Sequence, residues 1–433
     1  MVAVEQPSNT RWTIIALVFM IYVLMFIDRV NISIAAKFIM PEYGLTELQF
    51  GWIFSAFVLG YALSQIPGGW LGDRFGPRRV MTWAIVWWSI FTAATALAGE
   101  LILASTFGVV GSFMIVRILI GIGEAAAPPN GNRIVANWVA PQERAFSLGI
   151  AISGAQLGGA LTPPFIVWIM LTWGWREAFY FSGALGFVVA AAWYYFGRDT
   201  PEEHPKVNAA EMRHIAQGQS DRSEQAGALG DVPWRRLFGS RDLILLTIAY
   251  VVLGYISYFY FAWFYLYLVD ERGFSVTSGG FYTMGPFLMG AAAGPIGGWL
   301  SDRLSERYGK RIGRCGLSGV SMFFTGFLLL FGATTKNPIL AVVLLSLSIG
   351  VLYLSVSSFW AVTIDLTRTY AGTASGFMNM GGNLGGTVSP SLTPYLAQNY
   401  NWETSIMVMS GLCVVGALCW AGLHPEREID FSD

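Results

Sequence analysis

The chain has 433 residues, of which 54% are hydrophobic and only 12% are charged, and its mean hydropathy is +0.53. A soluble globular protein carries roughly 25% charged residues, so this chain has too few to coat soluble domains. Its 26 basic and 27 acidic residues leave a net charge of −1, which excludes the basic surface that nucleic-acid binding needs. The composition therefore predicts an integral membrane protein.

Apolar segments long enough to cross a bilayer as helices, which takes about 20 residues each, recur along the whole chain. Unbroken apolar runs exclude a membrane β-barrel, whose strands alternate over about 10 residues. We therefore predict an all-α membrane protein with 12 transmembrane helices. The predicted spans are 12–36, 48–71, 80–98, 112–138, 145–170, 177–197, 242–269, 277–300, 313–333, 338–364, 371–397 and 403–423.

One long polar segment divides the spans six plus six. We predict an N-terminal half at 1–197, a cytoplasmic linker at 198–241 and a C-terminal half at 242–433. The linker composition suggests a solvated segment with one short helix around Ala209–Gln217.

Lysine and arginine placement predicts the orientation in the membrane. If both termini are cytoplasmic, the inner connectors hold about 17 basic residues and the outer ones about four. Because basic residues favour the cytoplasmic side, we expect a multi-pass protein of the cell (inner) membrane with both termini inside.

The two halves share a repeated segment. GGWLGDRFGPRR begins at Gly68 and GGWLSDRLSERYGKR begins at Gly297, each after the second span of its half. Two ordinary basic loops would explain the arginines but not the shared GGWL-x-DR pattern, so the halves are predicted to be pseudo-symmetric. Small glycines allow close helix approach, and the two aspartates can pair with arginines or a helix end to latch the cytoplasmic side. The predicted gating residues are Asp73, Arg74, Asp302 and Arg303.

The repeated segment resembles the signature loop of the major facilitator superfamily, and the resemblance extends over essentially the whole chain. YVLMFIDRVNISIA in the first span, RILIGIGEAAAPPNGNRIVANW in the fourth and FMNMGGNLGG in the eleventh are similar to the anion:cation symporter family. That family includes bacterial aldonate, hexuronate and glucarate transporters. The resemblance implies a proton-linked carrier of organic anions, with a sugar acid as the expected substrate.

Charged side chains inside the spans are candidates for function, because each costs about 2.5–3.5 kcal/mol on insertion scales. Arg117 and Glu124 are seven residues apart, so they face the same direction about 10.5 Å from each other. Asp28 and Arg117 are predicted to pair across spans 1 and 4, which leaves Arg29 and Glu124 facing the cavity. The charged residues inside the spans are Asp28, Arg29, Arg117, Glu124 and Arg133, and Arg133 is expected to be structural.

The functional hypothesis gives each charge a role. Arg29 offers a guanidinium fork for a substrate carboxylate. Glu124 is expected to carry a proton with the substrate, and Asp28 is a second proton site whose protonation releases Arg117. The family resemblance points to the same four positions. The alternative is a static structural network of four charges.

Other cavity residues are suggested by polarity, aromatic character and resemblance. Tyr61 and Asn379 lie in segments that match the family, whereas Trp263 and Ser357 offer a ring and a hydroxyl that suit a sugar-like substrate. Trp263 can equally belong to an interfacial aromatic belt, and the polar residues can simply hold helices together. Pro128-Pro129 predict a bend just after Glu124, with either a gating or a packing role.

The predicted function is a proton-coupled symporter that imports an organic anion by alternating access. An exporter of drugs or metabolites is the alternative, although Arg29 favours anions. We expect no enzyme activity, because the spans hold no histidine and no nucleophile or metal motif, and the linker is too poor in apolar residues for a receptor domain. We further expect a monomer without metal or cofactor, with protons as the coupling ion and the lipid bilayer and a small anion as partners.

Overall fold

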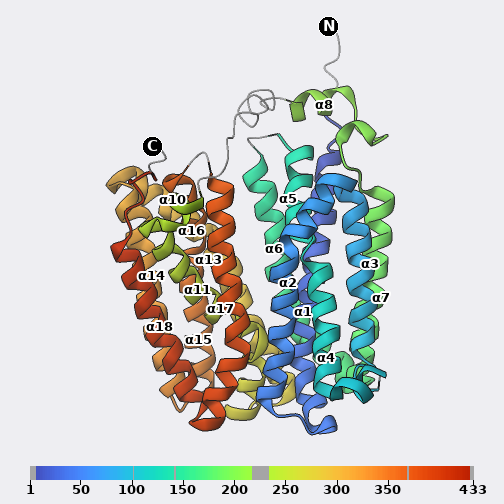
Figure 1. Ribbon diagram of the computed structural model, residues 1–433, viewed down its shortest axis with the longest axis vertical. Coiled ribbons are helices and arrows are strands. Elements are labelled where there is room, and N and C mark those ends of the chain that lie inside the picture. The colour runs from blue at the N-terminus through green and yellow to red at the C-terminus, as the bar shows by residue number, and fades with distance from the viewer. Residues whose placement is uncertain (1–5, 101, 141–142, 217–233, 368–369, 430–433) are drawn as a thin grey trace. The chain divides into compact units, whose positions relative to one another are not determined.

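The computed structural model describes residues 6–100, 102–140, 143–216, 234–367 and 370–429, and within these ranges it holds helices and no strand (Figure 1). The all-α prediction is confirmed. The long helices are α1 (Thr10–Tyr43), α2 (Glu47–Phe75), α3 (Pro77–Thr95), α4 (Ile102–Glu124), α5 (Ala127–Trp138), α6 (Arg144–Thr172), α7 (Trp175–Phe196), α11 (Arg241–Ala262), α13 (Val276–Tyr308), α14 (Leu317–Thr334), α15 (Pro338–Tyr353), α16 (Val356–Leu366), α17 (Ala371–Asn399) and α18 (Trp402–Gly422). The short elements are η1 (Pro201–Glu203), α8 (Ala209–Ala216), α10 (Trp234–Gly239), α12 (Phe264–Leu266), η2 (Tyr267–Glu271) and η3 (Arg311–Gly316).

The membrane segments follow the predicted count. In the described ranges, 9 helical segments are long and apolar enough to cross a membrane, and these include α4 with α5 and α15 with α16 as continuous spans. Three further helices, α3, α13 and α17, have 19, 33 and 29 residues and complete the twelve. α13 and α17 are less hydrophobic than the other spans, because they contain glycine, serine and threonine at positions where other spans contain leucine.

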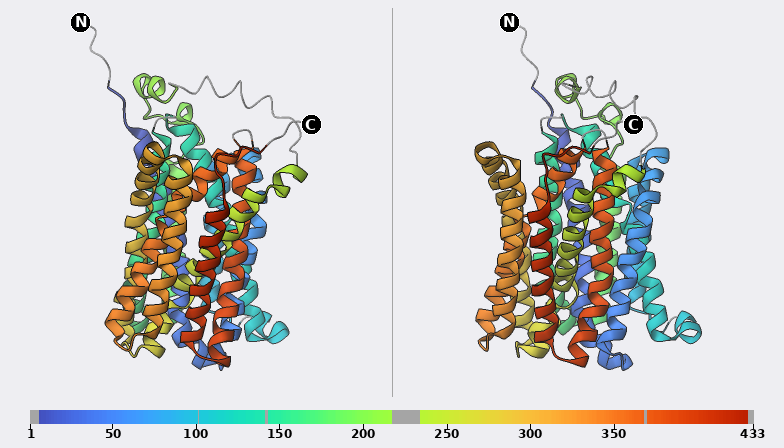
Figure 2. Two further views of the ribbon diagram at one scale, coloured as in Figure 1. Left: turned by 90° about the vertical axis from the view of Figure 1, so that its left-hand side faces the viewer. Right: turned by 60° about the vertical axis from the view of Figure 1, so that its left-hand side comes forward.

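Packing divides the described residues into two compact units. Unit 1 lies within 1–29, 59–159 and 172–230, and unit 2 lies within 30–58, 160–171 and 231–433, so α1, α2 and α6 contribute to both. In unit 1, α3 and α7 pack along their length, and in unit 2, α11 packs on α17 and α14 on α18 (Figures 1 and 2). The sequence-based halves and the linker remain a prediction.

The repeated glycines have the same packing role in each unit. A Cβ atom added at Gly68 would lie 2.8 Å from the Cα atom of Ala126, just after α4 ends. A Cβ atom added at Gly297 would collide with the backbone of Leu354, just after α15 ends. In both units, therefore, the first glycine of GGWL lets one helix touch the point where a neighbouring span is interrupted.

The interruption of the fourth span falls directly after Glu124. α4 ends at Glu124 and α5 begins at Ala127, with Pro128 and Pro129 in its first turn. Proline has no N–H, so the two prolines cannot donate to the carbonyl groups of Glu124 and Ala125. The sequence predicted a bend here, and the structure shows the helix interrupted at this point, where the two prolines remove hydrogen-bond donors.

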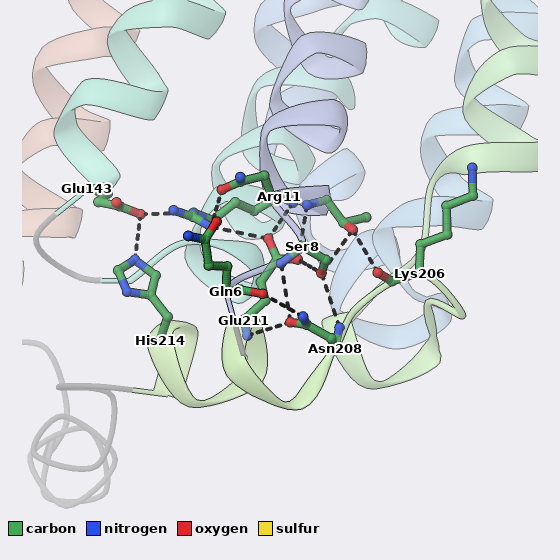
Figure 3. Close-up of polar contacts among 10 residues, drawn as sticks. Gln6, Ser8, Arg11, Glu143, Lys206, Asn208, Glu211 and His214 are labelled. Carbon is green, nitrogen blue, oxygen red and sulfur yellow. Dashed lines mark hydrogen bonds and ion pairs between the residues drawn. The ribbon is translucent and has the colours of Figure 1, made fainter. Parts of the chain in front are cut away.

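The connector helix α8 holds the beginning of α1 (Figure 3). Glu211 on α8 is fully buried and accepts the backbone N–H groups of Thr10 and Arg11, each at 3.0 Å, and the Ser8 hydroxyl. Arg11 also reaches Glu143 at 3.2 Å. The first N–H groups of a helix lack partners inside it, so Glu211 supplies them from outside. Burial acts to raise the pKa of Glu211, but these hydrogen bonds outweigh it and hold the pKa below its ordinary value.

The helix predicted around Ala209–Gln217 is thus confirmed as far as Ala216, and Gln217 lies outside the described residues.

Candidate functional site

The strongest candidate site is a buried cluster of four charges in unit 1, made of Asp28, Arg29, Arg117 and Glu124. Asp28 and Arg29 lie on α1, and Arg117 and Glu124 lie on α4. The seven-residue spacing on α4 places both of its members on one face, as the sequence predicted. This set is called the charge cluster below.

Arg29 and Glu124 form a direct ion pair. The Arg29 Nε atom donates to Glu124 Oε2 at 2.7 Å. The Glu124 side chain is 0% exposed and that of Arg29 is 12% exposed. Charge-assisted hydrogen bonds of this kind are about twice as strong as neutral ones, and one of the partners is still partly accessible. The sequence placed both residues toward a cavity but did not predict that they bind each other.

Asp28 is the second carboxylate of the charge cluster. It is 2% exposed, and both Arg117 and Glu124 are close enough to interact with it electrostatically. Arg117 lies near both carboxylates, which agrees with the predicted neighbourhood of Asp28 and Arg117. Within the described residues, neither oxygen of Asp28 has a hydrogen-bond partner of ordinary geometry, and the Thr92 hydroxyl on α3 beside it has none either.

Aromatic rings surround the Arg29 guanidinium. Its central carbon lies 4.5 Å from the centre of the Tyr61 ring on α2 and 5.4 Å from that of Phe26. Tyr22 on α1 is half-buried and lies close enough to Arg29 and Tyr61 to interact with them electrostatically. Stacking of a cation on aromatic faces fixes its orientation. Sequence reasoning found Tyr61 but missed Tyr22, which its seven-residue spacing from Arg29 would have placed on the same helix face.

The other predicted substrate contacts, Trp263, Ser357 and Asn379, lie in unit 2. Trp263 is fully buried, and its indole N–H donates to the Pro390 carbonyl oxygen at 2.9 Å. The Ser357 hydroxyl donates to the Gly294 carbonyl oxygen at 3.2 Å, which ties α16 to α13. Asn379 is half-buried on α17. The Ser357 contact fits the alternative of polar groups that hold helices together, whereas the complete burial of Trp263 does not fit a place in an interfacial belt. The roles of Trp263, Ser357 and Asn379 toward substrate stay a prediction.

The predicted gating residues differ between the two units. In unit 1, Asp73 forms a close ion pair with Arg133 of α5, while Arg74 lies over the ring of Trp70 at 5.4 Å. The structural role expected for Arg133 stays a prediction, because its partner Asp73 is one of the predicted gating residues.

In unit 2, Asp302 is exposed and Arg303 lies over Trp299 at 5.9 Å. The ion-paired carboxylate near the equivalent turn is Asp365, which binds Lys310 at 2.8 Å and Arg314 at 2.5 Å. Sequence reasoning missed Asp365, although an aspartate at the end of a span beside a basic turn was a usable signal.

In the part of the chain that the structure describes, no group of three or more His, Cys, Asp or Glu side chains could hold a metal ion.

The charge cluster can exchange ion-pair partners. A guanidinium beside two buried carboxylates can bind an anion when one carboxylate is neutralised by a proton.

The fold agrees with the comparison to known families. The sequence matches the Major Facilitator Superfamily model over residues 18–390 and again over 361–431. The chain therefore belongs to the major facilitator superfamily, and it is a multi-pass membrane transporter rather than an enzyme.

Individual relatives are similar along nearly their whole length. The probable sulfoacetate transporter SauU of Cupriavidus necator is 36% identical, over 99% of this chain and 97% of the relative. The probable galactarate/D-glucarate transporter GudP of Escherichia coli is 32% identical, over 91% and 88%. The hexuronate transporter of Bacillus subtilis is 31% identical, over 95% and 94%. The predicted resemblance to this group is confirmed.

Solved structures agree on the fold. A bacterial homolog of the human lysosomal transporter Spinster superposes with a TM-score of 0.74 at 19% identity, covering 95% of this chain and 96% of that one. A D-xylose-proton symporter gives a TM-score of 0.73 at 15% identity, covering 96% and 98%. The architecture is that of the major facilitator fold, with 12 transmembrane helices in two pseudo-symmetric halves.

Proposed function

We propose that the protein is a proton-coupled symporter that imports a small organic anion, with sugar acids as the first substrate class to test. The observation that carries this proposal is the buried ion pair between Arg29 and Glu124. Its relatives are named as transporters of galactarate or glucarate, hexuronate and sulfoacetate, all of which are small anions.

Arg29 is the residue that selects for anions. When Glu124 is ionised it occupies the Arg29 guanidinium, and when Glu124 takes up a proton the guanidinium becomes available to a substrate carboxylate or sulfonate. A guanidinium suits both groups, because it presents several N–H donors in one plane. The substrate anion therefore replaces the Glu124 carboxylate, and the proton moves with it.

Asp28 is the second proton site of the proposal. Burying an ionised carboxylate costs free energy unless it is paired and hydrogen-bonded. Arg117 is the positive charge that interacts with Asp28, so a proton on Asp28 would free Arg117 to interact with Glu124 or with substrate. Tyr61 would hold Arg29 in place during this exchange, because its ring lies against the guanidinium.

The membrane orientation belongs to the same proposal. The lysine and arginine distribution supports an inner-membrane protein with both termini on the cytoplasmic side. The protein works as a monomer, without a cofactor and with protons as the coupling ion. The exporter alternative is less well supported, because a pocket for cationic drugs would not be built around Arg29.

The test uses the purified full chain and a panel of anions. We expect thermal stabilisation by at least one of galactonate, glucuronate, glucarate and sulfoacetate, and uptake of that anion into proteoliposomes driven by an inwardly directed proton gradient. Arg29→Gln should abolish both effects. The matched control is Arg176→Gln, which removes an arginine paired with Glu100 at an exposed position of unit 1.

Two results would overturn the proposal. The first is substrate-driven stabilisation that survives in Arg29→Gln, and the second is uptake that is unaffected when a protonophore collapses the proton gradient. An ion-gradient-driven efflux of cationic dyes, without anion uptake, would favour the exporter.

A further inference from the structure

A lateral groove of about 530 Å³ lies between α2, α3 and α4 in unit 1, and no side chain of the charge cluster lines it. Its walls are apolar and include Leu71 and Phe75 from α2, Trp83 from α3 and Ile122 from α4. These side chains are open to the outside, since Trp83 exposes 72% of its surface. Large exposed rings on membrane-spanning helices contact lipid rather than water.

The groove has a basic residue at one end. Arg79 lies in the first turn of α3, and Trp83 and Trp87 follow one and two turns further, about 6 and 12 Å along the helix. In the described ranges no carboxylate pairs with Arg79. Its neighbour Arg78, in contrast, donates to the Tyr194 carbonyl oxygen at 2.6 Å. The groove thus carries a positive charge at the beginning of α3 and apolar rings further along the helix.

The floor of the groove is fixed and close to the interrupted span. The indole N–H of Trp87 donates to the Leu119 carbonyl oxygen at 2.8 Å, which holds its ring against α4. Gly68, Gly123 and Ala126 complete the floor. Gly123 and Ala126 lie on either side of Glu124 and its helix break, so a molecule that fills the groove touches the backbone of the proposed proton site.

We infer that this groove binds an anionic phospholipid, with one acyl chain between α2, α3 and α4 and the phosphate at Arg79. Charge complementarity selects the head group, because a basic residue near a membrane surface attracts anionic lipids. The apolar walls fit an acyl chain by close packing, because lipid tails are as apolar as the side chains of the groove. A bound chain packs on Gly123 and Ala126 and so steadies the break after Glu124.

The test measures lipid retention by the full chain in detergent, using native mass spectrometry. The probes are phosphatidylglycerol and phosphatidylcholine with identical acyl chains. We expect the wild type to retain phosphatidylglycerol about fivefold more strongly, because one basic residue contributes about 1 kcal/mol and 1.4 kcal/mol is tenfold. Arg79→Gln should remove this preference, whereas Arg79→Lys should keep it.

A second pair of variants separates the head group from the chain. Leu71→Trp fills the groove and should reduce binding of both lipids, while Arg307→Gln removes an exposed arginine outside the groove and should change neither. Equal retention of the two lipids by the wild type would overturn the inference, and so would an unchanged preference in Arg79→Gln. Chemical cross-links between two copies through Trp83, with lipid excluded, would show that a second chain occupies the groove and would also overturn it.

Discussion

Glu124→Gln is the substitution that tests the charge cluster most directly. It keeps the size of the side chain and its ability to accept a hydrogen bond from Arg29, but it removes the charge and the proton. Glu124 is completely buried and forms a 2.7 Å ion pair with Arg29. The substitution therefore changes one ion pair and one titrating group at once.

The expected size of the effect follows from that contact. A hydrogen bond to a charged group contributes about 1.5–3 kcal/mol and one between neutral groups about 0.5–1.5 kcal/mol. Replacing Glu124 by glutamine thus weakens its competition for Arg29 by about 1–2 kcal/mol. Since 1.4 kcal/mol is tenfold, an anion that competes with Glu124 for Arg29 should bind about 5- to 30-fold more tightly to the variant at neutral or higher pH.

The pH dependence gives the sign of the coupling. In the wild type, anion binding strengthens as the pH falls, because each protonated Glu124 leaves Arg29 to the substrate. One linked proton changes the dissociation constant by at most about tenfold per pH unit. The variant should lose this dependence, since glutamine does not titrate.

The assay combines equilibrium binding between pH 5 and 8 with transport in proteoliposomes. We expect Glu124→Gln to exchange substrate across the membrane but to lose proton-driven accumulation, and retained exchange shows that the variant is folded. Glu100→Gln, at a carboxylate that is 58% exposed and paired with Arg176, is the matched control. Uphill accumulation by Glu124→Gln, or a binding curve that follows pH as in the wild type, would refute the reasoning.

Three further predictions concern packing, the connector and the exposed ion pair. Gly68→Ala should lower the apparent Tm and the uptake rate, because the added Cβ atom would lie 2.8 Å from the backbone of the interrupted span, at a cost of about 1–3 kcal/mol. The control Gly149→Ala, whose Cβ atom would meet nothing within 4 Å, should change neither. Equal melting temperatures for the two variants would contradict this prediction. Glu211→Gln should lower the apparent Tm at pH 7, and this difference from the wild type should shrink below about pH 4.5. The reason is that a carboxylate whose pKa is depressed in the folded state stabilises the protein above its unfolded pKa. It loses that effect as the pH falls through the folded pKa. Arg133→Gln should leave the apparent Tm nearly unchanged, since its partner Asp73 is 71% exposed and such pairs contribute about 0–1 kcal/mol, while a reduced uptake rate would mark the pair as a gating contact.

The membrane class, the twelve spans and the repeat were all accessible from the sequence. Hydropathy is a sum over neighbouring residues, so it needs no knowledge of how helices pack. The charges in the spans were equally visible, because a bilayer makes any ionisable side chain conspicuous. Even the bend after Glu124 was predictable, since Pro128 and Pro129 remove hydrogen-bond donors whatever the surroundings are.

Only the tertiary structure decided which charges meet. The spacing on α4 placed Arg117 and Glu124 on one face, but the partner of each depends on the rotation and depth of α1 against α4, which sequence spacing does not contain. The structure pairs Arg29 with Glu124 and lays Tyr61 against the guanidinium, and it buries Trp263 in packing contacts. Partner choice among buried charges is a matter of a few ångströms between different helices, and those distances exist only once the chain has folded.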